Sequence, residues 1–276
     1  MTFTDRILLK DGGSIPNLGF GCWNAYGDDM RRAVAAALAC GYRYIDSAAR
    51  YQNEADVGRG LRDAAAARTS LYVLSKLWPL DFDAPERALD QTLRDLQLDY
   101  LDAYLIHWPG TDAARRHRAI EALLPLRGKK FQTLGVSNFQ IEHLRDFYAC
   151  FGFYPAINEI ELHPFYQERA LSEFCRAHDI ALVAWGPLYR ARAMEHPVIT
   201  ALAQTYQKTP AQILLRWHLQ SGHIPIPKSQ RSERIRENCA VFDFSLDADA
   251  MQALNDLDSG LHIGYDPYTY NGEISR

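Results

Sequence analysis

The chain has 276 residues, of which 47% are hydrophobic and 23% are charged, and its formal net charge is −4. These proportions are typical of a globular protein with a sizeable core, and the slightly negative charge argues against a basic surface for nucleic acid or anionic membranes. No apolar run approaches the roughly 18 residues that a transmembrane helix needs.

The first predicted element is a β-hairpin within the first 20 residues. The runs "RILLK" and "SIPNL" flank "DGG", a cluster that favours a tight turn. Short apolar runs then alternate with helical patterns along the rest of the chain. The strand-like runs cover residues 18–21, 42–45, 71–76, 101–107, 131–137, 155–160, 180–185 and 224–227.

Helical patterns occupy the intervals between these runs. Examples are "DMRRAVAAALAC", "APERALDQTLRDLQ", "IEHLRDFYACF" and "QERALSEFCRAH". In "TPAQILLRWHLQ", a threonine N-cap precedes a proline at the first helical position. The long interval after residue 185 leaves room for one additional helix, "HPVITALAQTYQ".

Eight strands, each followed by a helix, favour an α/β fold of the (β/α)8 TIM-barrel type with an N-terminal hairpin cap and extra helices. A doubly wound open sheet is the rival architecture. When such a sheet binds a dinucleotide it usually has a glycine-rich first turn, and "LGFGCWN" lacks the third glycine. No linker divides the chain, so we expect one barrel domain over residues 1–276.

The cysteines predict a reducing compartment. The five cysteines are scattered and never have CxxC spacing, which is typical of free thiols. The N-terminal segment "MTFTDRILLKDGGSIP" has no secretory apolar region. We therefore expect a cytoplasmic protein.

Polar residues follow three consecutive predicted strands. Asp46 ends the second strand, Lys76 the third and His107 the fourth, and Tyr51 lies in the loop after Asp46. The loops at the carboxyl ends of barrel strands form the active-site face, so these four side chains are expected to converge.

The four residues together suit the reduction of a carbonyl group. Asp46 would hold Lys76 as a fixed cation, and that cation would lower the pKa of Tyr51 from about 10. Tyr51 could then give a proton to the developing alkoxide, while His107 orients the carbonyl. Each residue alone is more often a helix cap, a loop anchor or a packed side chain, so the prediction depends on their combination.

The same segments resemble the aldo-keto reductase family over almost the whole chain. "GYRYIDSAARYQNEADVGRGL", "LGVSNFQIEHL" and "IPKSQRSERIRENCAVFDF" are similar to its three signatures, and "LSKLWP" and "LIHWPG" supply the remaining catalytic positions. From "ELHPFYQ", "WGPL" and "KTPAQILLRWHLQSG", the chain is most like the bacterial 2,5-diketo-D-gluconate reductase type. The resemblance implies the Asp46, Tyr51, Lys76 and His107 tetrad.

The resemblance also implies a nicotinamide cofactor across the barrel mouth. Ser137 and Asn138 would bind its carboxamide, and Trp185 would stack on its ring. Three cations and a hydroxyl after the last strand suit a 2′-phosphate, so NADPH is expected in preference to NADH. The implied cofactor contacts are Ser137, Asn138, Glu159, Trp185, Gly186, Pro187, Leu188, Lys228, Ser229, Arg231, Arg234, Glu237 and Asn238.

Two departures from the family pattern affect the cofactor site. Glu159 stands where the family usually has glutamine, and a carboxylate accepts hydrogen bonds from the carboxamide but cannot donate them. The segment "GPLYRARAMEHPVI" is short, so we expect a more open cofactor groove and weaker binding than in members with a long flap.

Aromatic residues in the strand-end loops and in the C-terminal tail predict an apolar wall for the substrate. Ordinary core packing is the alternative interpretation of these residues. The predicted pocket residues are Trp23, Tyr26, Trp78, Trp108, Phe139, Tyr265 and Tyr268, and Tyr270 could join them.

The sequence therefore predicts an NADPH-dependent reductase of aldehydes and ketones, with no metal, acting as a monomer on small molecules. His107, His143, His163 and the cysteines lack metal-ligand spacing. Two alternatives remain open: a lyase that uses Lys76 to form a Schiff base, and a non-catalytic regulator that binds NADP(H).

Overall fold

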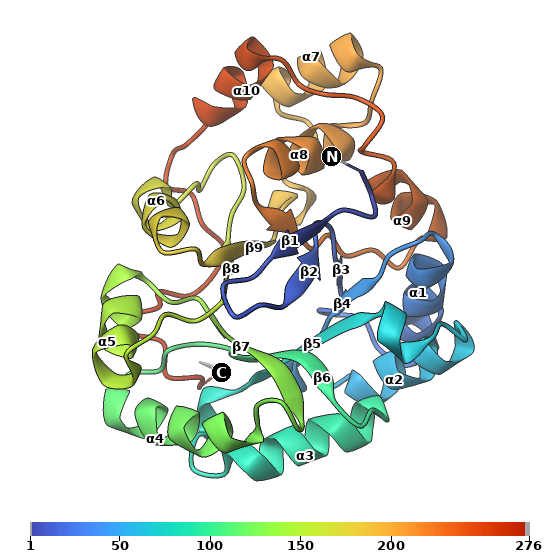
Figure 1. Ribbon diagram of the computed structural model, residues 1–276. Helices are drawn as coiled ribbons and strands as arrows, with labels where there is room; N and C mark the ends of the chain where they lie inside the picture. Colours follow the sequence, from blue (N-terminus) through green and yellow to red (C-terminus); the bar gives the residue numbers. More distant parts are fainter. Residues whose placement is uncertain (1, 274–276) are drawn as a thin grey trace.

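The computed structural model describes residues 2–273 and forms a (β/α)8 barrel (Figure 1). All seven pairings between neighbouring barrel strands are parallel, in the order β10-β9-β8-β7-β6-β5-β4-β3. The eight strands are β3 (Phe20–Gly21), β4 (Tyr44–Asp46), β5 (Tyr72–Leu77), β6 (Leu101–Ile106), β7 (Phe131–Ser137), β8 (Ile157–Glu161), β9 (Ala181–Trp185) and β10 (Ile224–Pro225). The predicted barrel is confirmed, and the open sheet is wrong.

Two prolines shape the seam between the first and last barrel strands. Proline has no N–H, so Pro225 and Pro227 can only accept hydrogen bonds across this seam. Gly19 N donates to Pro225 O at 3.0 Å, and Gly21 N donates to Pro227 O at 3.1 Å. Between the prolines, Ile226 N donates to Ala184 O on the other side. The "IPIP" run therefore closes the barrel.

The N-terminal hairpin covers one end of the barrel. Strands β1 (Arg6–Leu8) and β2 (Ser14–Pro16) pair antiparallel around the predicted turn, and Figure 1 shows them across the barrel opening. Leu9 and Ile15 pack with the side chains that fill the barrel interior, among them Tyr44 and Leu105. The hairpin therefore closes the end at which the barrel strands begin.

The helices follow the predicted alternation. Thr209 caps α8 as predicted: its hydroxyl accepts from Gln212 N at 3.3 Å, and Gln212 Oε1 accepts from Thr209 N at 3.0 Å. The helices are α1 (Gly27–Ala39), α2 (Glu54–Asp63), α3 (Pro85–Leu96), α4 (Ala113–Leu123), α5 (Ile141–Phe151), α6 (Arg169–Ala177), α7 (Pro197–Tyr206), α8 (Pro210–Gln220), α9 (Ser232–Cys239) and α10 (Ala248–Asn255).

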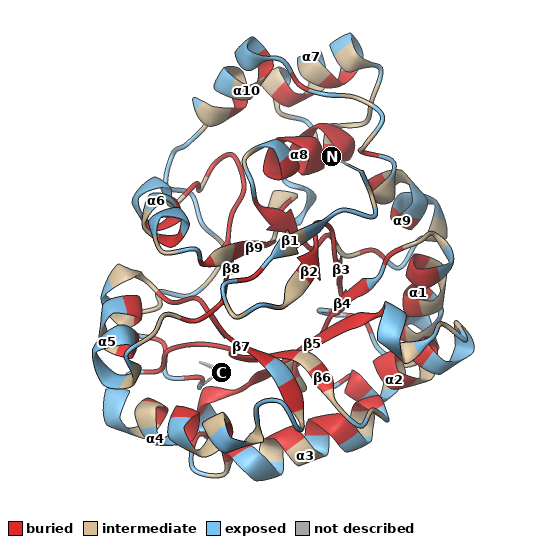
Figure 2. Ribbon diagram, in the orientation of Figure 1, coloured by how far each residue is buried: buried red, intermediate tan, exposed pale blue. Residues whose placement is uncertain are grey.

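Burial follows this architecture (Figure 2). The barrel strands are almost wholly buried, while most of the surrounding helices bury one face and α8 is buried along nearly its whole length. The additional helix α7 packs with α8 and α10 in a cluster of its own, which contains Ile199, Trp217 and Leu254. This group lies to one side of the barrel (Figure 1).

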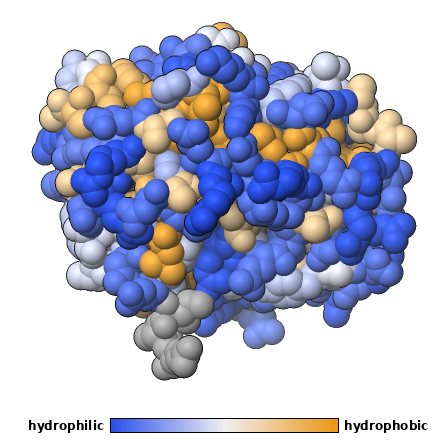
Figure 3. Space-filling model, turned by 90° about the horizontal axis from the view of Figure 1, so that it is seen from below, coloured by the Kyte–Doolittle hydropathy of each residue, from blue (hydrophilic) through white to orange (hydrophobic). Residues whose placement is uncertain are grey.

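The molecular surface seen from below is largely hydrophilic, with separate groups of apolar side chains (Figure 3). Within the described residues, no helix has the length and apolar character needed to cross a membrane. The exposed large apolar side chains include Trp23, Tyr26, Tyr265 and Tyr268, which were predicted to line the substrate pocket.

Candidate active site

The barrel brings Asp46, Tyr51, Lys76 and His107 to one mouth. Lys76 Nζ lies 2.5 Å from Asp46 Oδ1 and 3.5 Å from Tyr51 Oη. The Tyr51 ring comes from a short 3-10 turn, η1 (Ala49–Tyr51), and meets the His107 ring edge-on with centroids 5.7 Å apart. The convergence expected from consecutive strand ends is therefore present, while the catalytic roles stay a prediction.

Lys76 is completely buried, and its ammonium is held by Asp46 and by the backbone of Ser47. Its ammonium donates to Asp46 and to Ser47 O at 3.1 Å, and Tyr44 Oη donates to the other Asp46 oxygen at 2.7 Å. Burial opposes the charged form, but the carboxyl groups of Asp46 and Glu159 raise the pKa of Lys76 well above its usual value. Lys76 is consequently a permanent cation at neutral pH.

Glu159 contacts the same ammonium, which the sequence did not predict. Its Oε1 lies 3.2 Å from Lys76 Nζ, and its side chain is 2% exposed. Burial and the nearby Asp46 raise the pKa of Glu159 well above its usual value. Two carboxyl groups thus share one lysine. The signal available in the sequence was the departure from glutamine at this position.

Tyr51 differs from the expectation based on Lys76. Burial raises the pKa of Tyr51 more than the nearby Lys76 ammonium lowers it, and Asp46 and Glu159 raise it further. Lys76 therefore acts on the pKa of Tyr51 in the predicted direction, but burial outweighs it in the cofactor-free protein. The sequence could reveal the neighbouring cation, but the loss of solvent around the phenol depends on packing.

His107 faces Tyr51 as an uncharged ring. Burial, followed by the positive charge of Lys76, lowers the pKa of His107 well below its usual value. Its ring also meets Trp78 edge-on at 5.0 Å between centroids. A neutral imidazole keeps one N–H that can be donated to a substrate oxygen.

Three side chains beside the tetrad form a connected polar group. Trp185 Nε1 donates to Asn138 Oδ1 at 2.9 Å, and Asn138 Nδ2 donates to Ser137 Oγ at 3.0 Å. Asn138 Nδ2 also donates to His107 O at 2.9 Å. The amide and hydroxyl groups predicted to bind a carboxamide therefore lie at the same mouth as the tetrad.

The far side of the mouth has groups that fit a phosphate. Arg231 and Arg234 are exposed at the start of α9, and neither has a carboxylate partner within residues 2–273. Lys228 Nζ donates to Asn24 O at 2.9 Å. Cationic side chains beside a helix N-terminus are suited to an anion.

The remaining predicted cofactor contacts lie in the turns that follow β9 and β10 and on α9. Gly186 adopts φ +65°, in the region that favours glycine, and Pro187 beside it is buried. Glu237 accepts from the Thr209 hydroxyl at 2.6 Å, and Asn238 is buried on α9. Their contacts with a cofactor stay a prediction.

Comparisons with known proteins agree with this geometry. The profile of the Aldo/keto reductase family matches residues 17–259. The chain belongs to this family. It is 44% identical to "Methylglyoxal reductase DkgA" of Yersinia pestis over 276 residues, covering 99% of this chain and 100% of the relative.

Two solved structures of similar proteins contain the cofactor. A mutant of Gox0644 in complex with NADPH is 39% identical, with a TM-score of 0.91, covering 96% of this chain and 98% of the other. An aldo-keto reductase of Bombyx mori in complex with NADP is 32% identical, with a TM-score of 0.89 and 99% of each chain covered.

In this aldo-keto reductase, a short loop reaches across the mouth. Tyr189, Arg190 and Ala191 all have positive φ, between 49° and 65°. This conformation brings the Arg190 guanidinium to 4.6 Å from the centre of the Trp23 ring. The loop is short, as the sequence indicated, yet it contacts the opposite side of the predicted groove. Open access and weak binding therefore stay predictions.

The C-terminal tail covers the tetrad with aromatic side chains. Trp78, Trp108 and Tyr270 form a buried cluster, in which Tyr270 is 8% exposed. The Trp108 and Tyr270 ring centroids are 4.9 Å apart, and Tyr265 stacks on Tyr270 at 4.2 Å. The tail thus adds aromatic rings to this cluster, and its role as a wall for the substrate stays a prediction.

Two predicted pocket residues, Phe139 and Tyr268, lie away from the tryptophan cluster, and a pocket role for Tyr26 stays a prediction. Phe139 is fully buried in the core between the barrel and its helices, so the structure places it beneath the mouth and not on its surface. The hydroxyl of Tyr268 donates to Glu142, toward α5 and away from the tryptophan cluster. Tyr26 is 56% exposed at the N-cap of α1.

Glu161 anchors the tail, a role that the sequence analysis missed. Its two oxygens accept from Ile263 N and Gly264 N, both at 2.8 Å, and His163 Nε2 lies 2.9 Å from Oε1. Gly264 packs so closely on Trp185 that an added Cβ would lie 2.8 Å from its ring. The "IELHP" segment was the available signal, but it does not identify its partner in the tail.

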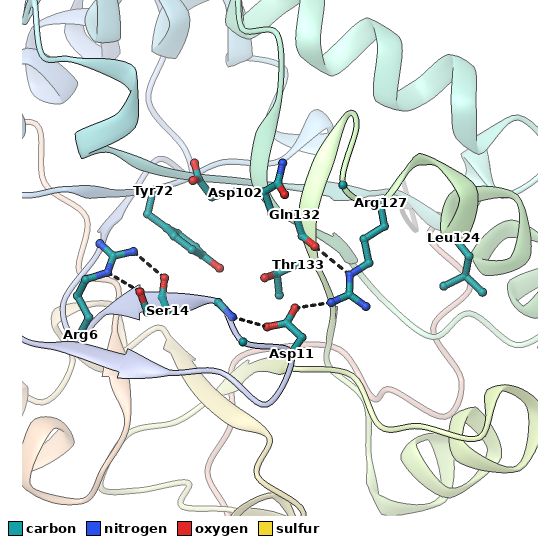
Figure 4. Close-up of a pocket in the computed structure, with 12 residues that line it drawn as sticks. Arg6, Asp11, Ser14, Tyr72, Asp102, Leu124, Arg127, Gln132 and Thr133 are labelled. Atoms are coloured by element: carbon teal, nitrogen blue, oxygen red, sulfur yellow. Dashed lines mark hydrogen bonds and ion pairs between the residues drawn. The ribbon is translucent and has the colours of Figure 1, made fainter.

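A cavity of about 770 Å³ lies at the hairpin end of the barrel (Figure 4). Its arginines already have partners: Arg6 donates to Ser14 Oγ, and Arg127 donates to Asp11 and to Gln132 O. The cavity is at the opposite end from the tetrad. Its size alone does not make it the active site.

Proposed function

We propose that this protein reduces aldehyde and ketone carbonyls with NADPH and that Tyr51 donates the proton. The observation that carries the proposal is the contact of one buried ammonium, Lys76, with both Asp46 and the Tyr51 hydroxyl beside a neutral His107. Bound NADPH would supply a hydride to the carbonyl carbon.

The residues of the tetrad divide the remaining work. Tyr51 stays protonated at neutral pH, because burial raises the pKa of its phenol, and it can therefore give its proton to the substrate oxygen. Lys76 stabilises the phenolate that remains, and Asp46 holds Lys76 in place. His107 donates its ring N–H to the same oxygen and orients the carbonyl.

The cofactor is held by the polar groups around the mouth. Ser137 and Asn138 would bind the carboxamide, and Trp185 would flank the ring. Arg231 and Arg234 would bind the 2′-phosphate, which supports a preference for NADPH over NADH. Hydrogen bonds between an arginine guanidinium and a doubly charged phosphate are charge-assisted, and they are stronger than hydrogen bonds between neutral groups.

The substrate class is a set of small aldehydes and α-oxo compounds, bound against Trp78 and Trp108. The name of the Yersinia pestis relative supports methylglyoxal as one member of this set. A Schiff-base lyase is not favoured, because such a nucleophile must be a neutral amine and the carboxyl groups around Lys76 raise its pKa.

The proposal is tested by measuring the oxidation of NADPH in the presence of methylglyoxal, an aromatic aldehyde or a diketo-sugar acid. We expect turnover with at least one of them, and a lower kcat/KM with NADH. Binding of NADPH without turnover on any carbonyl would instead support a regulator. We also propose a cytoplasmic monomer, which size-exclusion chromatography and cell fractionation would check.

A further inference from the structure

Two buried carboxyl groups contact the ammonium of Lys76. Asp46 Oδ1 lies 2.5 Å and Glu159 Oε1 lies 3.2 Å from Nζ, and none of the three side chains is more than 2% exposed. One ammonium neutralises one carboxylate. A second carboxylate ion in the same dry site is strongly disfavoured, so one of the two groups has to carry a proton.

The hydrogen bonds identify the protonated carboxyl group. Both Asp46 oxygens accept a hydrogen bond, one from Lys76 and the other from Tyr44 Oη at 2.7 Å. Glu159 has the longer contact with Lys76, and its side chain also forms a hydrogen bond with the Asp46 carboxyl group, which requires a proton on one of the two. Asp46 is therefore the ion, and Glu159 is the acid.

The groups around Glu159 offer no second positive charge among the described residues. Asp46 and Tyr44 face it from β4, Tyr51 from η1 and Lys76 from β5. His107, on the far side of Lys76, stays neutral because burial lowers its pKa. The neighbours of Glu159 across the sheet are Ser137 on β7 and Val183 on β9, and both are uncharged.

The balance between the protonated and the ionised form of Glu159 changes with the redox state of the cofactor. The nicotinamide ring must lie beside the tetrad, because its hydride has to reach the carbon whose oxygen Tyr51 protonates. The ring is neutral in NADPH and positive in NADP⁺. An added positive charge next to a buried carboxyl group favours its ionised form.

We propose that Glu159 senses the charge of the cofactor: it keeps its proton in the free protein and beside NADPH, and releases it to solvent when NADP⁺ binds. This inference rests on the proposed function. The carboxylate so formed would strengthen NADP⁺ binding as pH rises. It would also make NADP⁺ slower to leave.

Proton release on binding tests the inference directly. We would titrate the wild-type protein with NADP⁺ and with NADPH by calorimetry, in two buffers of different protonation enthalpy, between about pH 6 and pH 9. The 2′-phosphate also titrates near pH 6, but it is common to both cofactors, so the difference between them cancels it.

We expect NADP⁺ to release up to about one proton more than NADPH, and the ratio of the two Kd values to change by up to about tenfold per pH unit. Glu159→Gln should abolish both differences. Glu54→Gln is the matched control, because Glu54 is another buried carboxyl group with a raised pKa, and both differences should persist in it.

Equal proton release for the two cofactors in the wild type would overturn the inference, as would a difference that survives in Glu159→Gln. If neither NADPH nor NADP⁺ bound to the protein, the proposed function itself would be overturned. Should Glu159→Gln not fold, infrared difference spectra in the Glu54→Gln background decide: the protonated carboxyl band must be present with NADPH and absent with NADP⁺.

Discussion

The reactivity of Tyr51 depends on a balance between two opposing effects on one hydroxyl group. Burial favours the neutral phenol, and the Lys76 ammonium 3.5 Å away favours the phenolate. The neutral form wins in the free protein, so the acid needed for carbonyl reduction is fully populated at neutral pH. We expect kcat for reduction to stay flat through neutral pH and to fall only in alkaline solution, as the phenol ionises.

Replacing Tyr51 by phenylalanine removes the proposed proton donor and little else, because Lys76 retains its bonds to Asp46 and Ser47. We expect kcat to fall by about 10²- to 10⁴-fold while the Kd for NADPH stays near that of the wild type. Tyr148→Phe, at an exposed site on α5, is the control. Activity of Tyr51→Phe within a few-fold of the wild type would exclude Tyr51 as the donor.

Glu54 makes stability depend on pH. It accepts from Ser75 Oγ and Thr92 Oγ1, but burial outweighs these bonds and raises its pKa from 4.5 to about 7. A raised pKa stabilises the fold below about pH 4.5, and this contribution is lost as pH rises through 7. The loss amounts to about 3 kcal/mol at most.

Glu54→Gln should remove that dependence. Urea unfolding at pH 5 and pH 8 would measure the free energy of unfolding of both proteins. We expect the wild type to lose stability relative to the variant on going to the higher pH. A constant difference between the two proteins would show that Glu54 does not titrate in this range.

At the scale of single elements, we expect the start of α9 to control the choice between NADPH and NADH. Arg234 is exposed there without a carboxylate partner in the described chain, whereas Arg236 lies 4.0 Å from Glu233. Arg234→Ala should weaken NADPH binding by about 10- to 100-fold, since a bond to a charged group is worth about 1.5–3 kcal/mol, and leave NADH binding unchanged. Arg236→Ala is the control, and an equal loss for NADPH and NADH would contradict the assignment.

The C-terminal tail is the element that we expect to form the outer wall of the substrate pocket. Tyr270 packs on Trp78 and Trp108, so Tyr270→Ala should raise KM for an aromatic aldehyde by about 2- to 10-fold, as expected from aromatic pairs worth about 0.5–1.5 kcal/mol. Methylglyoxal has no ring and should be less affected. Tyr268→Ala should have little effect, because Tyr268 points toward α5. Steady-state kinetics of the wild type, Tyr270→Ala and Tyr268→Ala with both substrates would measure these changes in KM.

The whole molecule depends on the seam between β3 and β10. A Cβ at Gly21 would lie 2.8 Å from Ile226 O, a backbone atom that cannot move without opening the barrel. We expect Gly21→Ala to lower the free energy of unfolding by about 1–3 kcal/mol, with an unchanged denaturant m-value, in urea titrations. A variant as stable as the wild type would mean that the seam can widen freely.

The alternation of strands and helices was readable from the sequence, because barrel strands buried on both faces are short apolar runs and the helices carry a 3.6-residue period. The tetrad was also predictable, since consecutive parallel strands end at the same side and the four residues follow those ends. The cap of α8 and the additional helix α7 were also predicted correctly, because both depend on residues that are close together in the sequence.

Only the tertiary structure decided what depends on packing between distant segments. Glu159 on β8 contacts Lys76 on β5, Glu161 holds a tail about a hundred residues away, and Tyr270 completes the aromatic wall. The direction of the pKa shift of Tyr51 belongs here too, because the removal of water from a phenol is a property of the assembled mouth. Local sequence therefore determined the elements and the predicted catalytic set, while burial and the neighbouring charges in the assembled mouth determined the protonation of its members.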